Sequence, residues 1–115
     1  MSFRDSDYYK HMSDEMKMGM EIMLRFVEGK PVEIESGNET WNFKDEEVKD
    51  LANRLGIEES KARENLLKTL DERMITISNC GSKFCLYPSP EYVNIYKMEG
   101  QMLGIYEVKE RWKTD

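Results

Sequence analysis

The chain has 115 residues, a formal charge of −6 at neutral pH and 35% charged side chains. A chain of this length is expected to form one domain, residues 1–115, with its own core. Its 39% hydrophobic content, with two Trp, six Tyr and four Phe, is too high for a disordered chain. The acidic balance excludes a protein that is basic over its whole surface, as a nucleic-acid coat would be.

The first predicted element is a helix over residues 8–28. Its apolar residues recur every three or four positions, which places them on one helical face: Tyr8, Met12, Met16, Met20, Met23, Leu24 and Val27. Six of the nine methionines lie in the first 23 residues, a composition typical of an adaptable core or a dimer seam. Met18 lies off the stripe, so we expect it to face a second helix or a partner chain. Gly29 and Pro31 end the helix.

A short hairpin or two short strands are predicted next. Val32 and Ile34 alternate with glutamates, residues 36–38 have turn chemistry and residues 40–43 are extended in pattern. Asp45 can cap a helix that ends at Gly56.

A further helix is expected from about Glu58 to Glu72, with its inward residues at Ala62, Leu66, Leu67 and Leu70. Residues 75–87 then predict a second hairpin. Ser89 and Pro90 are a helix start, and the residues that follow predict a C-terminal helical extension within 88–115. For residues 92–108 the pattern leaves helix and hairpin both open, since Gly100 and Gly104 weaken a helix.

Residues 44–87 carry a resemblance to a known family. The segment from Glu47 to Leu66 reads EVKDLANRLGIEESKARENL. It resembles the E-[LIV]-x-x-L-A-x-x-L-G-[IV]-x-x-S-x-[AV]-x-x-x-L pattern of winged helix-turn-helix regulators such as the MarR and ArsR groups. The flanking helices resemble the dimer-forming helices of MarR-like and PadR-like proteins. The resemblance implies an α+β winged helix-turn-helix fold that is mostly helical, with an extra hairpin before the motif and helical extensions at both ends.

Two departures from that pattern concern the ends of the second helix of the motif. Residues 71–75 lack the glycine that usually leads into the wing, so the chain must leave the helix by another geometry or the helix is one residue longer. Glu58 stands where the family usually has serine or threonine, and Glu59 follows it. Carboxylates there suit the helix dipole but would face phosphates.

The function that the resemblance implies is sequence-specific binding of double-stranded DNA by a small transcriptional regulator. In such proteins the second helix of the motif, here 58–72, enters the major groove, and the wing, here 75–87, contacts the backbone or minor groove. Carried over by position, the DNA-binding residues are Ser60, Lys61, Arg63, Glu64, Asn65, Lys68 and Lys83. Residues 60–87 hold five basic and three acidic side chains, although the whole chain is acidic. A single chain supplies few phosphate contacts, so this function depends on a homodimer, which we expect from helix 8–28 and segment 90–113.

The alternative is a winged-helix module that binds a protein and no DNA. In that case Glu58, Glu59 and Glu64 would meet a basic partner, and Trp41 or Trp112 would anchor the contact. The sequence contains no nucleophile–base pair, glycine-rich phosphate loop or metal-ligand cluster, so we expect no enzyme, no metal and no cofactor.

Two cysteines, Cys80 and Cys85, lie at the second hairpin. Their predicted strand register places Cys80 opposite Lys83, so a disulfide would need distortion, and a zinc site would need two more soft ligands. We expect ordinary small side chains, with a redox switch as the alternative.

No run approaches the ~18 apolar residues of a membrane span, and the first residues lack the apolar core of a signal peptide. These features favour a cytoplasmic protein without a membrane partner.

Overall fold

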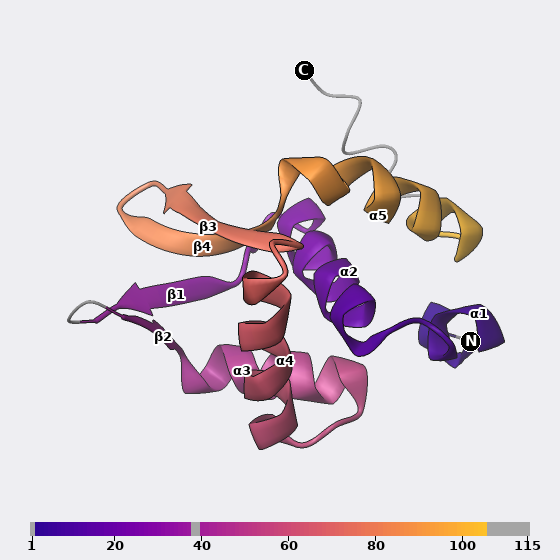
Figure 1. The fold of residues 1–115 in the computed structure, drawn as a ribbon, viewed down its shortest axis with the longest axis horizontal. Coiled ribbons are helices and arrows are strands. Elements are labelled where there is room, and N and C mark those ends of the chain that lie inside the picture. The colour runs from indigo at the N-terminus through magenta and orange to yellow at the C-terminus, as the bar shows by residue number, and fades with distance from the viewer. Residues whose placement is uncertain (1, 38–39, 106–115) are drawn as a thin grey trace.

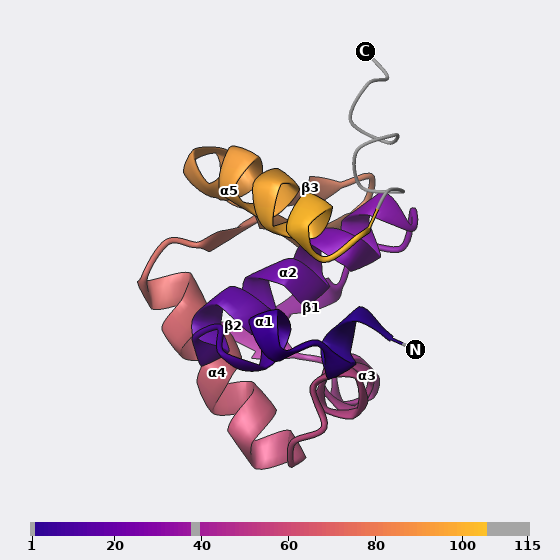
Figure 2. The same ribbon diagram turned by 90° about the vertical axis from the view of Figure 1, so that its right-hand side faces the viewer.

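The computed structural model describes residues 2–37 and 40–105, which form an α+β fold of five helices and one four-stranded antiparallel sheet (Figure 1). In chain order the elements are η1 (Phe3–Asp5), α1 (Asp7–Lys10), α2 (Asp14–Val27), β1 (Glu33–Ser36), β2 (Trp41–Phe43), α3 (Asp45–Leu55), α4 (Glu59–Asp71), β3 (Ile75–Cys80), β4 (Lys83–Pro88) and α5 (Pro90–Met102). Helix α2 lies in the middle, with α5 on one side of it and the α3–α4 pair on the other (Figures 1 and 2). Among the described residues no helix is both long and apolar enough to cross a membrane.

The predicted helix over 8–28 is wrong at its start, because the chain forms the short helix α1 and then begins again as α2. The hydroxyl of Ser13 accepts a hydrogen bond from the backbone N–H of Met16 at 3.1 Å, which caps α2. Acidic residues at 14 and 15 fill the first turn, where they suit the helix dipole. As a result Tyr8 leaves the apolar stripe and is 44% exposed.

A buried carboxylate attaches the first ten residues to α2. Glu21 is fully buried, and its two oxygens accept hydrogen bonds from Nε and Nη2 of Arg4, both at 2.7 Å. The hydroxyl of Tyr9 donates to the same carboxylate at 3.0 Å. Burial first, and the charge of Glu21 second, raise the pKa of Tyr9 above its ordinary value. Nη1 of Arg54 also lies 3.8 Å from Oε1 of Glu21, so the buried carboxylate has two guanidinium neighbours and one hydroxyl donor.

The sheet has the strand order β2-β1-β4-β3. Both predicted hairpins form: β1 pairs with β2, and β3 pairs with β4 across a two-residue turn in which Gly81 has a φ of 77°. Strand β1 joins the hairpins by pairing Glu33 with Cys85 and Ile34 with Phe84. The sheet therefore ties the segment before α3 to the hairpin that follows α4.

Helices α3 and α4 end in different ways. Gly56, with a φ of 68°, ends α3 as predicted, but the residue that caps the start of α3 is Lys44, so the prediction of an Asp45 cap is wrong by one residue. At the end of α4, where the family pattern has glycine, Arg73 takes a positive φ of 60°. The backbone N–H of Met74 then donates to the carbonyl of Thr69 at 3.1 Å, as in a Schellman ending.

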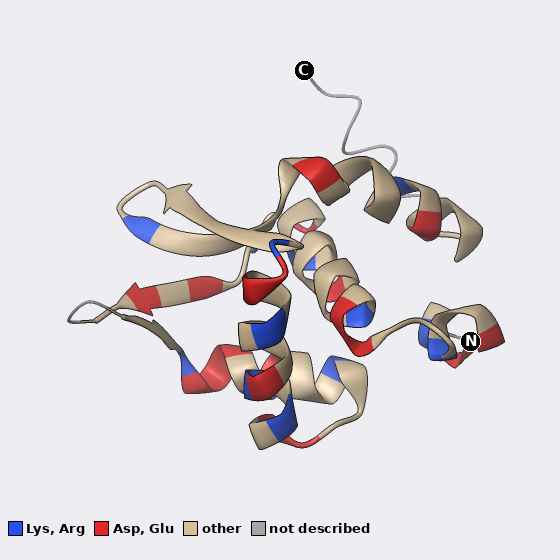
Figure 3. Ribbon diagram, in the orientation of Figure 1, with Lys and Arg blue, Asp and Glu red and all other residues tan. Residues whose placement is uncertain are grey.

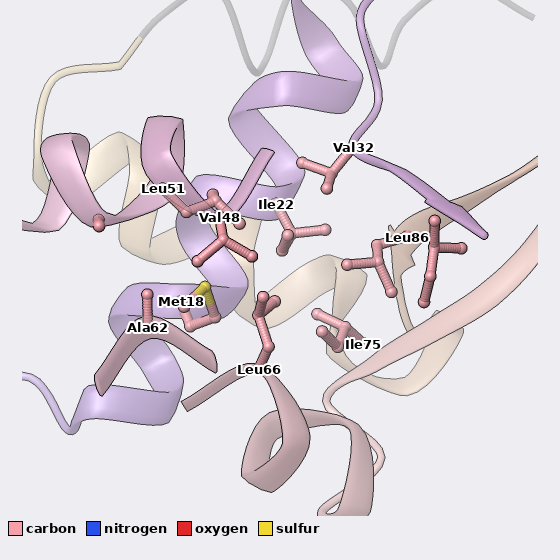
Figure 4. Packing of buried hydrophobic residues seen from close by; sticks show 11 residues of the cluster. Met18, Ile22, Val32, Val48, Leu51, Ala62, Leu66, Ile75 and Leu86 are labelled. Carbon is pink, nitrogen blue, oxygen red and sulfur yellow. The ribbon is translucent and has the colours of Figure 1, made fainter. Parts of the chain in front are cut away.

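Two clusters of buried side chains share α2. Met18 and Ile22 face α3, α4 and the sheet, in a cluster completed by Val32, Ile34, Val48, Leu51, Ala52, Ala62, Leu66, Ile75 and Leu86 (Figure 4). The prediction that Met18 faces a second helix is therefore confirmed. The second cluster packs α2 against α5 and comprises Met20, Met23, Leu24, Val27, Tyr96 and Ile105. Met18, Met20 and Met23 of α2 are thus core residues of one chain, and Met16 packs partly buried against the second cluster.

Helix α5 settles the open question for residues 92–102 in favour of a helix. It approaches α2 at Gly19, where a Cβ would lie 2.8 Å from Cε1 of Tyr96, so only glycine allows this contact. The buried hydroxyl of Tyr96 donates to the carbonyl of Met74 at 2.9 Å. The helix ends at Met102, and Gly104 follows with a φ of 77°. Residues 106–115, which include the predicted anchor Trp112, lie outside the described residues.

Candidate nucleic-acid interface

One side of α4 is open to solvent. Ser60, Lys61, Glu64 and Lys68 are exposed there, and Arg63 is half-buried. These five predicted site residues therefore share the outward side of one helix, as the sequence predicts. Lys83 lies at the tip of the β3–β4 hairpin and is exposed as well.

Asn65 does not belong to this face, so its assignment as an outward residue is wrong. Its exposure is 7%, and its carbonyl accepts a hydrogen bond from the hydroxyl of Thr69 at 2.5 Å. The buried side of α4 consists of Ala62, Asn65, Leu66 and Thr69. At 100° per residue, position 67 lies well away from this side, which explains why Leu67, predicted to face inward, is 60% exposed.

The cations of this face each have an acidic neighbour. Lys61 lies 4.0 Å from Glu64 within α4, and Lys68 lies 3.4 Å from Glu15 of α2. Arg63 pairs with Asp45 at the start of α3. Figure 3 shows these blue segments along α4 with red segments beside them. The face is therefore mixed in charge and not a basic patch.

Ion pairs connect the outward side of α4 with the hairpin tip through the start of α3. Lys83 lies 3.2 Å from a carboxylate oxygen of Glu33, and Lys44 lies 2.7 Å from the other oxygen. Asp45, which follows Lys44 in the chain, forms an ion pair with Arg63 of α4. The two lysines, Lys44 foremost, hold the pKa of Glu33 below its ordinary value. A series of ion pairs thus leads from the hairpin tip through Glu33 and the Lys44–Asp45 segment to Arg63 of α4.

The start of α4 has no side-chain cap. Glu58 occupies the cap position without a hydrogen bond from its side chain to the helix. Glu59 stands in the first turn, where its charge suits the helix dipole. The two carboxylates at this end would repel a nearby phosphate.

Sequence reasoning missed a groove of mixed polarity at the end of α4. The groove, of about 510 Å³, lies between the end of α4, the start of β3 and Trp41 of β2, and Leu70 and Arg73 are among its lining residues. Trp41 is 43% exposed and packs edge-on against Phe84, with 5.0 Å between ring centroids. The alternating pattern of residues 40–43 could have indicated that Trp41 lies at the surface. It could not have indicated that Trp41 lines a groove with Leu70 of α4.

Cys80 and Cys85 form a disulfide, so the expectation of two free thiols is wrong. The predicted register is right: Cys80 pairs with Lys83, and Cys85 pairs with Ser78. The Cα atoms of the two cysteines are nevertheless 6.0 Å apart, within the ordinary range for a disulfide. The cysteines consequently give no support to a reducing compartment.

The described residues contain no group of three or more His, Cys, Asp or Glu side chains placed to hold a metal ion. In comparisons with known proteins, no family model matches the chain, and neither does any curated protein or solved structure. Any function must therefore be argued from this chain's own residues.

Proposed function

We propose that the chain is a winged helix-turn-helix protein that binds double-stranded DNA in a sequence-specific manner as a homodimer and regulates transcription. The order of elements supports this: α3, a tight turn at Gly56, α4, and then the hairpin β3–β4, with β1 pairing beside β4. In this proposal α4 is the recognition helix and the β3–β4 hairpin is the wing. No catalytic role is part of it.

The observation that carries the proposal is that one side of α4 is open to solvent and carries cations, with Lys83 exposed at the tip of the following hairpin. Ser60, Lys61, Arg63 and Glu64 lie in its first two turns, the part of a recognition helix that contacts base edges. Lys68 and Lys83 lie at the two flanks and are suited to phosphate contacts. Lysine and arginine pair with guanine edges and carboxylates accept from cytosine, so the set can read sequence. Asn65 is left out because it is buried.

The cations on this face can reach a phosphate, because the side chains of Lys61, Lys68 and Lys83 are 52%, 61% and 59% exposed. The pair of Lys61 with Glu64 is exposed on both sides and contributes about 0–1 kcal/mol, so a phosphate can replace Glu64 at small cost. Glu15 and Glu33 are only 14% and 31% exposed, so Lys68 and Lys83 would contact a phosphate with these carboxylates still beside them. A chain of net charge −6 needs several such contacts.

Helix α5 is the proposed dimer contact. Ile95, Met98 and Met102 are 38%, 66% and 69% exposed and are spaced three and four residues apart, so they form one stripe. The stripe is centred on Met98, and two copies crossing antiparallel about a twofold axis would set Ile95 of each against Met102 of the other. The α2 part of the predicted seam is buried within the chain, so α5 alone carries this contact.

Selection of duplexes from a random pool, followed by anisotropy titrations at several salt concentrations, tests the proposal. We expect a preferred sequence and a log–log salt slope well below zero. Lys83→Ala should weaken binding to all sequences alike, whereas Lys61→Ala should also change the preference. Lys49→Ala, an exposed lysine of α3, is the control. Binding no tighter than to random DNA, with a slope near zero, excludes the proposal.

A protein-binding module is the second candidate, and two exposed apolar side chains favour it. Trp41, which lines the groove, is 43% exposed, and tryptophan is a typical anchor of protein contacts. Leu67 is 60% exposed on the outward side of α4 and would add apolar contact area. The variants Leu67→Ser and Trp41→Ser discriminate the two functions. Unchanged DNA binding in both variants favours the DNA function, whereas loss of a captured protein with no DNA binding in the wild type favours the second candidate.

A further inference from the structure

A cleft of about 650 Å³ opens beside the tip of the β3–β4 hairpin, next to the connection between α2 and β1. The charged residues in its lining are Arg25, Lys30, Lys83 and Glu33. Arg25 is engaged with Glu47 and Asp50, and Lys83 contacts Glu33 at 3.2 Å, so these charges largely balance. Lys30 forms no ion pair within the described residues and is the cation that a visiting anion meets at the cleft.

Both cysteines of the disulfide line the same cleft. Cys85 is 1% exposed, whereas Cys80 is half-buried. A thiolate that enters the cleft can therefore approach the sulfur of Cys80 and not that of Cys85. In thiol–disulfide exchange, access decides which sulfur is attacked.

We propose that Cys80–Cys85 is a redox-active disulfide that exchanges with an anionic low-molecular-weight thiol of the glutathione class, and that the cationic cleft selects this reductant. The reductant thiolate attacks Sγ of Cys80, a mixed disulfide forms, and the sulfur of Cys85 leaves as a thiolate and takes up a proton. A second reductant thiolate attacks the first reductant's sulfur and releases Cys80 as a thiolate, which is protonated in turn. Two reductant thiols become one disulfide, and the protein gains two thiols.

The exchange acts on the end of the hairpin. Beyond the pair of Ser78 with Cys85, the tip is held by the pairs of Asn79 with Phe84 and of Cys80 with Lys83. The disulfide crosses this stretch diagonally. Reduction removes the covalent bond across the tip. The tip then depends on these backbone pairs, on the contacts of Phe84 with Ile34 and Trp41, and on the contact of Lys83 with Glu33. The redox state therefore sets the order of the tip, whatever the chain binds.

Reduction rates with thiols of different charge test the proposal. The oxidised full chain is treated with glutathione (anionic), 2-mercaptoethanol (neutral) or cysteamine (cationic) at equal thiolate concentrations, then quenched, alkylated and weighed by mass spectrometry. We expect no alkylation before reduction, a mixed disulfide that maps to Cys80, and a faster reaction with glutathione than with cysteamine. Added salt should reduce that preference, because it screens the cleft.

Lys30→Glu reverses one charge at the mouth, and Lys49→Glu makes the same change on the exposed side of α3 as a matched control. We expect the glutathione-to-cysteamine rate ratio to fall by about threefold or more in Lys30→Glu and to stay at the wild-type value in Lys49→Glu. The proposal is overturned by thiols that are alkylated without reductant, by a mixed disulfide on Cys85, or by equal ratios in the two variants. The salt series on the wild-type chain keeps the test valid if Lys30→Glu does not fold.

Discussion

Asp45→Asn is expected to strengthen DNA binding while weakening the fold only slightly. Asp45 is the first residue of α3, its side chain is 85% exposed, and it holds the guanidinium of Arg63. An exposed pair contributes at most about 1 kcal/mol, and a carboxylate in the first helical turn about as much. The free energy of unfolding should therefore fall by no more than about 2 kcal/mol.

The gain in binding follows from Coulomb's law. A carboxylate about 6 Å from a phosphate repels it by ~0.7 kcal/mol in water. Removing this charge from both protomers of a dimer should strengthen binding by ~1.4 kcal/mol, about tenfold in Kd. Each protomer then presents one more uncompensated positive charge to the DNA, so the log–log salt slope should become steeper by up to about 1.8.

Fluorescence anisotropy with the selected duplex measures both quantities. Asp5→Asn is the matched control, because Asp5 is an exposed carboxylate of η1, at the end of the molecule opposite the hairpins (Figure 1). Its Kd should equal that of the wild type. Equal affinities and equal slopes for Asp45→Asn and Asp5→Asn would refute the assignment of Arg63 to the interface.

Three further predictions concern the fold. Arg73→Gly should raise the free energy of unfolding by about 1 kcal/mol, measured by urea denaturation, because it removes a side chain from a left-handed conformation; a decrease would show that the Arg73 side chain stabilises the ending of α4. Gly19→Ala should lower that free energy by about 1–3 kcal/mol, since the added methyl group collides with Tyr96. Gly81→Ala is the comparison: its methyl group meets no atom within 4 Å, so its loss of stability comes only from the positive φ. Burial raises the pKa of Tyr96, so above pH ~10 the unfolded chain loses this proton first and the free energy of unfolding falls with rising pH. Tyr96→Phe should make that fall shallower by up to about 1.4 kcal/mol per pH unit, and parallel curves would contradict the assignment.

Local patterns predicted most of the elements, because each depends on residues close together in the chain. Gly56 ends α3, the turn before Lys83 sets a two-residue hairpin, and Ser89 with Pro90 starts α5. The errors arose where two local signals compete. The apolar stripe favours one continuous helix through residue 13, whereas the Ser13 side chain favours a helix start there. The cap prevails, so the segment forms two helices instead of the predicted one.

Contacts between distant residues could not be predicted in this way. Glu21 sits among apolar residues, and its partner Arg4 lies 17 residues away, so nothing local shows that its charge is satisfied. The disulfide was missed because strand register alone does not give the distance between two Cα atoms. At the candidate site, helical periodicity predicts the other exposed residues of α4. The predictions for Asn65 and Leu67 are reversed, because they follow the polarity of the two side chains and not the 100° rotation per residue of a helix.

Amide chemical-shift mapping of the full chain with the selected duplex tests the central claim most directly. The proposed function predicts shifts at residues 59–68 of α4 and 81–83 of the hairpin tip, with residues 95–102 of α5 unchanged by DNA. The same duplex with its preferred bases scrambled should shift Lys68 and Lys83 but leave Ser60 and Lys61 unchanged at the same salt concentration. Shifts confined to other surfaces, or none at saturating DNA, would contradict the proposal that α4 and the wing bind DNA.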